Sequence, residues 1–242
     1  MTGHGVPATV VLVHGAWHGS WCWDDVVTGL RSRGTVAVAV DLPSRSGAGS
    51  LAADAAFVRA VIQGIDGPVV LCGHSYGGGV ITEAAAGLAS VDHLVYLCAL
   101  MLDAGESAMQ SVDVEVPPGS TDLEQAIMVG DDGTIRVDPA TAVSAFYADV
   151  TPALAAAATD HLTPQPAASL AEGPSAVAWR DIPSTYVVCT DDRAIPVVVQ
   201  RALAARATTT VEWPTSHSPF LSRPELVVDL LADLSDLSDL SG

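Results

Sequence analysis

The sequence predicts an α/β fold with a doubly wound, mainly parallel sheet of about six strands. Short apolar runs alternate with segments of helical periodicity along much of the 242 residues. The runs are nearly continuous in apolar residues, as is typical of strands covered by helices on both faces. A hydrophobic content of 49% and a charged content of 16% indicate a globular chain with a sizeable core. This alternation favours parallel strands joined by helical crossovers.

Six apolar runs are expected to form the strands of this sheet. They are Thr9–Val13, Val36–Val40, Val69–Cys72, Leu94–Ala99, Thr185–Cys189 and Thr208–Trp213. Four helices are expected to connect or follow them. They are Trp21–Arg33, Ser50–Ile65, Tyr76–Ala89 and Pro196–Arg206. In the third of these helices, Val80, Ile81 and Ala84 recur at helical spacing and predict a stripe that faces the core.

The alternation breaks after Met101. Between residues 103 and 181 no clear buried strand appears, and Pro and Gly residues separate alanine-rich pieces of helical character. So long an insertion is rarely a bare loop. We therefore predict a core of residues 1–102 and 183–242. Residues 103–182, called the cap below, are expected to form a mostly helical lid over the C-terminal edge of the sheet.

The motif with the clearest chemical meaning is Gly73-His74-Ser75-Tyr76-Gly77. It follows an apolar run and precedes a helical pattern. Gly-x-Ser-x-Gly between a strand and a helix is typical of a nucleophile elbow, a strained turn that exposes a serine hydroxyl. The two glycines allow a sharp turn and close helix packing because they lack a Cβ. Ser75 is therefore the candidate nucleophile.

A serine nucleophile requires a base, and the base works best when a carboxylate orients it. Two later strands end in suitable residues: one runs into Asp191 and Asp192, the other into His217. The carboxyl ends of parallel strands meet at one edge of a sheet, where ligands bind. We expect His217 to be the base and prefer Asp192, four residues before Pro196, as the acid. Asp191 remains the alternative, and would otherwise be a turn residue.

An oxyanion hole is expected beside Ser75. One donor should be the backbone N–H of Tyr76, directly after the nucleophile, and the other that of Ala16 in the loop after the first strand. Gly15, Trp17 and His18 of this loop are the candidate substrate-binding residues, although His18 could equally be a polar filler.

We expect neither a metal nor an organic cofactor. His14 and His18 have the i, i+4 spacing of helical metal sites, but they lie in a glycine-rich loop with no acidic or cysteine partner. The four cysteines form no Cys-x-x-Cys pair and are expected to be small core residues in a reducing compartment. They are Cys22, Cys72, Cys98 and Cys189.

The charge balance excludes several kinds of partner. The formal net charge is −18, and all ten basic residues are arginines. Such an acidic chain argues against nucleic acid and anionic membranes as partners. Met1 to Ala8 resemble no signal peptide, and no run is long enough to span a membrane, so a cytoplasmic location is expected. The sequence does not specify the oligomeric state.

Taken together, these motifs resemble the α/β-hydrolase superfamily and, within it, the plant methylesterase and hydroxynitrile lyase group, of which we expect a bacterial member. The matching segments are residues 11–21, 41–42, 73–78 and 189–196. The resemblance implies the α/β-hydrolase fold, with the cap inserted after the strand that corresponds to the sixth of that fold. The catalytic acid of the methylesterases stands in a turn similar to the one around Asp192, and their oxyanion alanine falls on Ala16.

The resemblance also bears on the reaction. The lyases of this group replace the loop glycine with threonine and carry a lysine directly after the catalytic histidine, where this chain has Gly15 and Ser218. That lysine holds cyanide, so its replacement implies ester hydrolysis. One departure is Ser216, since the plant enzymes usually have an aspartate before the histidine.

The sequence thus predicts a serine hydrolase that cleaves a small hydrophobic or aromatic carboxylic ester or lactone through an acyl-enzyme on Ser75. Two alternatives stay open. One is a lyase, decarboxylase or cyclase of the same fold that uses His217 as base. The other is a ligand receptor with little turnover.

Overall fold

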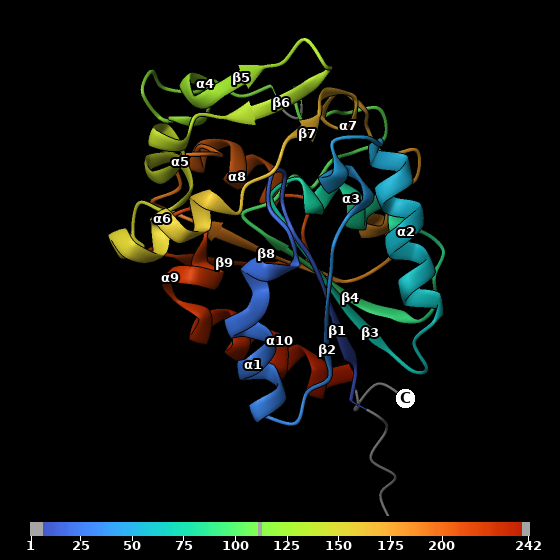
Figure 1. Cartoon of the computed structure of the whole chain (residues 1–242). Helices are drawn as coiled ribbons and strands as arrows, with labels where there is room; N and C mark the ends of the chain where they lie inside the picture. The colour runs from blue at the N-terminus through green and yellow to red at the C-terminus, as the bar shows by residue number, and fades with distance from the viewer. Residues whose placement is uncertain (1–6, 111–112, 239–242) are drawn as a thin grey trace, which may run out of the picture.

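The computed structural model describes residues 7–110 and 113–238 and has a six-stranded sheet at its centre (Figure 1). The strand order is β2-β1-β3-β4-β8-β9, and each neighbouring pair is parallel. The strands are β1 Thr9–Val13, β2 Ala37–Val40, β3 Val69–His74, β4 Val91–Leu97, β8 Ser184–Cys189 and β9 Thr209–Trp213. The predicted α/β fold with six parallel strands is confirmed.

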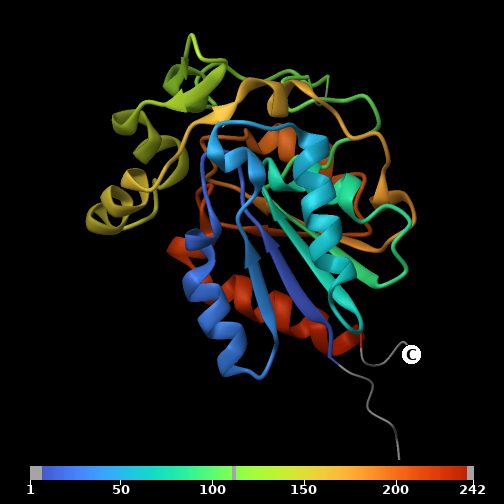
Figure 2. The ribbon, with the colours of Figure 1, turned by 45° about the vertical axis from the view of Figure 1, so that its right-hand side comes forward.

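Helices cover both faces of this sheet (Figure 2). One face carries α1 (Asp24–Ser32), α9 (Pro219–Ser222) and α10 (Pro224–Ser238). The other carries α2 (Leu51–Gln63), α3 (Gly77–Ala84) and α8 (Val197–Ala204). Successive strand residues point to opposite faces, so Val10 and Leu12 join the first layer whereas Val11 and Val13 join the second. This is why the strands are apolar throughout.

Two expected helices differ in extent from the prediction. The segment predicted as Trp21–Arg33 begins with a 3₁₀ turn, η1 (Ser20–Trp23), before α1 starts. The helix predicted to reach Ala89 ends at Ala84, because the chain reverses through Gly87, which has a left-handed φ of 71°. A left-handed residue of this kind favours glycine and stops helical hydrogen bonding.

The cap contains a small antiparallel sheet that the sequence analysis did not predict, in addition to the expected helices. Its strand order is β5-β6-β7. The cap elements are α4 Leu123–Ala126, β5 Ile127–Val129, β6 Thr134–Val137, α5 Pro139–Phe146, α6 Pro152–Asp160, β7 Gln165–Pro166, α7 Ala167–Ala171 and η3 Ala178–Arg180. These strands are two to four residues long and β5 is exposed, so no buried apolar run marks them.

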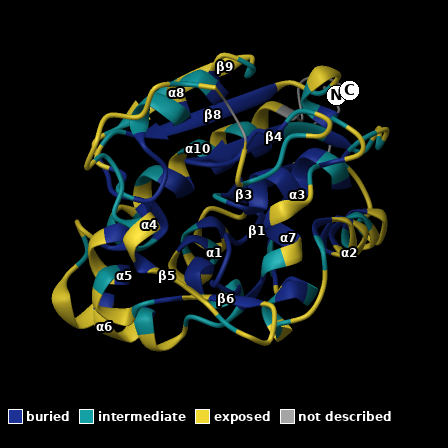
Figure 3. Cartoon of the chain, turned by 90° about the horizontal axis from the view of Figure 1, so that it is seen from above, coloured by how far each residue is buried: buried dark blue, intermediate teal, exposed yellow. Residues whose placement is uncertain are grey.

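The cap lies over the edge where the parallel strands end. Figure 3 shows the buried strands β3, β4 and β8 in the interior and the largely exposed helix α6 at the periphery. Within the described ranges, no helix is long and apolar enough to cross a membrane. Residues 1–6, part of the segment in which no signal peptide is expected, lie outside those ranges.

Candidate active site

Ser75 occupies a strained turn between β3 and α3. Its φ of 51° lies in the left-handed region, which non-glycine residues seldom adopt. The flanking glycines permit this turn, because a Cβ on Gly73 would lie 2.5 Å from the carbonyl oxygen of Gly77. A Cβ on Gly77 would lie 2.7 Å from the carbonyl oxygen of His14. The strand, turn and helix of a nucleophile elbow are therefore present.

Asp192 and His217 form a buried pair at the same edge. The Nδ1 of His217 donates to Oδ2 of Asp192 over 2.7 Å, and the two residues are 1% and 5% exposed respectively. The other carboxylate oxygen accepts from the backbone N–H groups of Ala194, at 2.7 Å, and Ile195, at 3.0 Å. Asp191 is exposed. Of the two candidate aspartates, Asp192 is the one that lies against the histidine.

Gln200, on the buried face of α8, also holds this carboxylate and was missed in the sequence analysis. Its Nε2 donates to Oδ2 of Asp192 and to the carbonyl oxygen of Ile195, both at 2.8 Å. Its Oε1 accepts from the backbone N–H of Cys189 over 2.9 Å. The available signal was a polar residue within the helical stretch directly after the acid turn.

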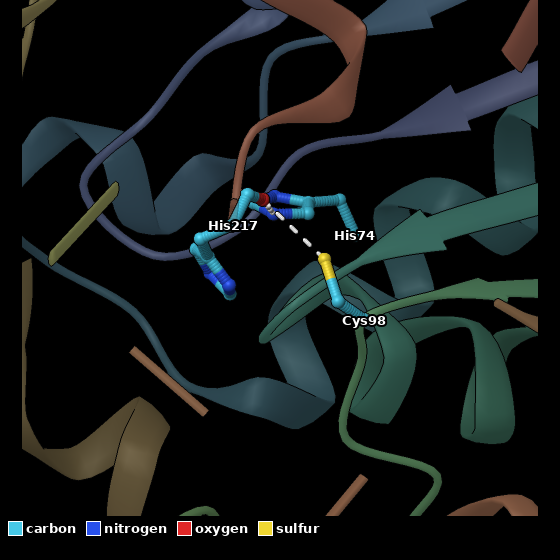
Figure 4. A group of neighbouring side chains, drawn as sticks. All are labelled: His74, Cys98 and His217. Atoms are coloured by element: carbon cyan, nitrogen blue, oxygen red, sulfur yellow. Dashed lines mark hydrogen bonds between the residues drawn. The ribbon is translucent and has the colours of Figure 1, made fainter. Parts of the chain in front are cut away.

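The backbone carbonyl of His217 is held by two side chains, those of His74 and Cys98 (Figure 4). His74 donates from Nε2 to the carbonyl oxygen of His217 over 2.8 Å, and the Cys98 thiol donates to the same oxygen over 3.3 Å. Burial holds the pKa of His74 well below, and that of the Cys98 thiol well above, the ordinary values, so both stay neutral. The potential ligand atoms of these three residues lie within 4.8 Å of one another, but here two of them position the His217 backbone.

The residues that carry the expected oxyanion donors line the same cavity as Ser75. Ala16, Ser75 and Tyr76 all line one cavity of about 480 Å³. Among the described residues, no acceptor is found for the N–H groups of Ala16 and Tyr76 or for the Ser75 hydroxyl. Their polar groups therefore remain available to a ligand. In unliganded enzymes, catalytic hydrogen bonds often tighten only when substrate binds.

The cavity is predominantly apolar and extends between the core and the cap. Besides the residues around Ser75, its wall includes Leu100, Met109, Leu123, Leu170, Ile195 and Val199. Trp17 lines the cavity as expected, whereas Gly15 and His18 are not among its lining residues. His18 is a buried residue of the loop formed by residues 14–19, called the oxyanion loop below, and its Nδ1 donates to the carbonyl oxygen of Ala16 over 2.8 Å. Among the described residues of the wall, Glu124 is the single carboxylate and none is an arginine.

Two buried histidines, His14 and His74, pack against the backbone of the oxyanion loop. His14 donates from Nδ1 to the carbonyl oxygen of Gly15 over 2.8 Å and accepts from the backbone N–H of Leu42 over 3.1 Å. Burial lowers the pKa of His14 to about 4, so the imidazole stays neutral near pH 7. A Cβ on Gly15 would lie 2.8 Å from Nδ1 of His74. Gly15 thus allows the loop to pack directly against the elbow.

A strained serine, a buried His–Asp pair and two available N–H groups at one sheet edge fit the class of serine hydrolases built on an α/β sheet. The chain belongs to the alpha/beta hydrolase family, whose family model matches residues 10–230. The predicted superfamily is therefore confirmed.

Similar proteins include enzymes of several kinds. The alpha/beta hydrolase nvfD of Aspergillus novofumigatus is 31% identical over 241 residues, covering 92% of this chain and 94% of the relative. Methylesterase 18 of Arabidopsis thaliana is 29% identical and covers 94% of this chain and 97% of its own length. The crystal structure of a pyrethroid hydrolase from Sphingobium faniae superposes with a TM-score of 0.81 at 25% identity, covering 95% and 97% of the two chains. These relatives confirm the resemblance to plant methylesterases and the prediction of a carboxylic ester hydrolase.

Proposed function

We propose that the chain hydrolyses carboxylic esters or lactones through an acyl-enzyme on Ser75, with His217 as general base and Asp192 as the acid that orients it. The observation that carries this proposal is the buried His217–Asp192 hydrogen bond of 2.7 Å at the sheet edge where half-buried Ser75 lines the cavity. The hydrogen bond fixes the tautomer in which Nε2 of His217 is free to accept a proton.

In the proposed reaction, the Ser75 hydroxyl attacks the ester carbonyl while its proton passes to Nε2 of His217. The N–H groups of Ala16 and Tyr76 stabilise the oxyanion, and loss of one such donor costs ~3 kcal/mol in a serine protease. The C–O bond then breaks, and the leaving alcohol takes the proton from His217. Water attacks the acyl-enzyme by the same route and releases the acid and free Ser75. The proposed chemistry requires neither a metal nor an organic cofactor.

The cavity supports a neutral, hydrophobic or aromatic ester or lactone as the substrate. Its volume of about 480 Å³ and apolar wall suit a small organic molecule. Glu124 disfavours substrates that carry a second, ionised carboxyl group. The solved structure that is similar to this chain is that of a pyrethroid hydrolase. Because the net charge is −18, we propose an enzyme without nucleic acid or anionic membrane partners. We also propose a cytoplasmic location.

A fluorophosphonate probe tests this proposal because it reacts with activated serines. We expect stoichiometric labelling that peptide mass spectrometry assigns to Ser75, and no labelling or ester hydrolysis in Ser75→Ala. Ser32→Ala is the matched control, since Ser32 is an exposed residue of α1 whose hydroxyl donates to the Gly29 carbonyl. Labelling elsewhere, or ester hydrolysis that survives Ser75→Ala, contradicts the proposal.

A panel of esters varied in the acyl and alcohol groups should define the substrate. Hydrolysis in ¹⁸O-labelled water should place the label in the released acid. Turnover without label in an acid product would favour the lyase, decarboxylase or cyclase alternative. Binding of panel compounds without turnover would favour the receptor alternative.

A further inference from the structure

The cap holds the oxyanion loop through Trp17, which makes three hydrogen bonds with cap residues. Its backbone N–H donates to Oε1 of Gln165 over 3.4 Å, and its carbonyl oxygen accepts from the N–H of Thr163 over 2.9 Å. Its indole Nε1 donates to the carbonyl oxygen of Ile135 over 2.9 Å. Trp17 has a left-handed φ of 64°, a conformation that persists only where surrounding contacts enforce it. The cap supplies these contacts.

The peptide group between Ala16 and Trp17 is held on both sides. Its N–H is held by Gln165, as described above. Its carbonyl oxygen accepts from Nδ1 of His18 over 2.8 Å, and the hydroxyl of Tyr147, at the end of α5, lies 2.9 Å from Nε2 of the same imidazole. Cap side chains thus determine the orientation of the peptide that directly follows the proposed oxyanion donor.

The orientation of the Gln165 amide follows from the hydrogen bonds of Ser169. The hydroxyl of Ser169 donates to the carbonyl oxygen of Pro166 over 2.7 Å, so it accepts from Nε2 of Gln165, also over 2.7 Å. The amide oxygen of Gln165 must therefore face Trp17. Gln165 is 1% exposed, so its side chain is shielded from bulk solvent.

The tautomer of His18 also follows from its hydrogen-bond partners. Its Nδ1 faces a carbonyl oxygen and must carry the proton, so Nε2 is an acceptor and the Tyr147 hydroxyl is its donor. Burial lowers the pKa of His18 to about 3, which keeps the imidazole neutral. The connection from Tyr147 through His18 to Ala16 therefore persists over the neutral pH range.

We propose that Gln165 and Tyr147 are positioning residues that hold the Ala16–Trp17 peptide in place and thereby aim the Ala16 N–H at the oxyanion. The cap then has two roles: it encloses the apolar substrate and it completes the oxyanion hole. This inference rests on the proposed function, because it assumes that Ala16 stabilises an oxyanion formed by attack of Ser75. A misdirected N–H weakens transition-state binding more than ground-state binding.

Tyr147→Phe and Gln165→Met test the inference, since each removes one polar contact and nearly preserves side-chain volume. We expect kcat for a good ester to fall about tenfold in each variant and KM to stay within about twofold. The Ki of a boronic acid that forms a tetrahedral adduct with the serine should rise by the same factor as kcat falls. Thr159→Val is the control, because Thr159 lies in the cap and, within the part of the chain that the structure describes, its hydroxyl donates only to the Ala155 carbonyl of α6.

The possible results separate the two proposals. Folded variants with unchanged kcat, or a loss seen in KM alone with an unchanged boronate Ki, overturn the positioning role. If Gln165→Met does not fold, as judged by its thermal melting curve, Tyr147→Phe decides the question. Retained ester hydrolysis in Ser75→Ala contradicts the proposed function itself, whatever the cap variants do.

Discussion

Gln200 donates from Nε2 to Oδ2 of Asp192 over 2.8 Å, the same oxygen that accepts the His217 hydrogen bond. The Gln200 amide and the His217 imidazole therefore hold the same carboxylate oxygen. Because the amide of Gln200 is fully buried and also bonds to the Cys189 N–H, it cannot be replaced by water. The helix that follows the acid turn therefore participates in organising the proposed triad.

Replacing this amide by a hydrocarbon should weaken both stability and activity. In Gln200→Leu, the buried Cys189 N–H loses its acceptor, at a cost of about 1–3 kcal/mol in the free energy of unfolding. We expect kcat/KM to fall about tenfold, because Oδ2 of Asp192 loses the second of its two side-chain donors and is held less firmly against His217. Urea denaturation and steady-state kinetics measure the two effects. Gln125→Leu, at an exposed cap position, should change neither. Unaltered kinetics in a destabilised Gln200→Leu would restrict its role to folding.

The two adjacent aspartates should respond very differently to amidation. Asp192→Asn removes the carboxylate that fixes the His217 tautomer, a change that costs on the order of 10⁴-fold in kcat in a serine protease. Asp191→Asn alters an exposed side chain and should retain most of the activity. The comparison requires kcat for one ester with both variants, each checked for folding by circular dichroism. An inactive Asp191→Asn beside an active Asp192→Asn would show that the acid is misassigned.

The buried histidines predict a loss of stability in acid. Burial lowers the pKa of His14 to about 4 and that of His18 to about 3, whereas an imidazole in the unfolded chain titrates near ~6.5. Between those values the unfolded state binds more protons than the folded state, so stability is complete above about pH 6.5 and falls as the pH is lowered. Each histidine changes the free energy of unfolding by at most about 1.4 kcal/mol per pH unit.

Urea unfolding between pH 7.5 and pH 5 measures this dependence. We expect the free energy of unfolding to decrease with pH by up to about 3 kcal/mol per unit from these two residues together. His14→Asn should reduce the slope by about half of that amount even if it lowers stability at neutral pH. A stability that does not change over this interval would mean that the imidazoles are protonated in the folded state.

Glu124 should select against negatively charged esters. The Glu124 carboxylate repels a second, ionised carboxyl group of a bound substrate and so weakens binding of that substrate. Solvent at this exposed position reduces the repulsion. Glu124→Gln should therefore raise kcat/KM for a monoester of a dicarboxylic acid by about threefold and leave a neutral ester of similar size unchanged. The difference should shrink at high salt. An equal effect on both esters would indicate a steric rather than an electrostatic role.

Local patterns in the sequence were sufficient for the sheet, the elbow and the two later loops. Continuous apolar runs such as Thr9–Val13 specify strands buried on both faces, because each successive side chain faces a different layer. The glycines on either side of Ser75 mark a turn that no larger residue permits. The position of His217 follows from strand order alone, since parallel strands present their carboxyl ends at one edge.

Only the tertiary structure decided between Asp191 and Asp192, because the direction of each carboxylate depends on how the turn packs against α8 and the histidine loop. The short strands of the cap were beyond prediction, since they are brief and partly exposed. The contacts of Gln165 and Tyr147 with the oxyanion loop join residues 148 and 129 positions apart in the chain. Sequence periodicity reports which face of an element is buried, whereas such long-range hydrogen bonds exist only after the layers have packed.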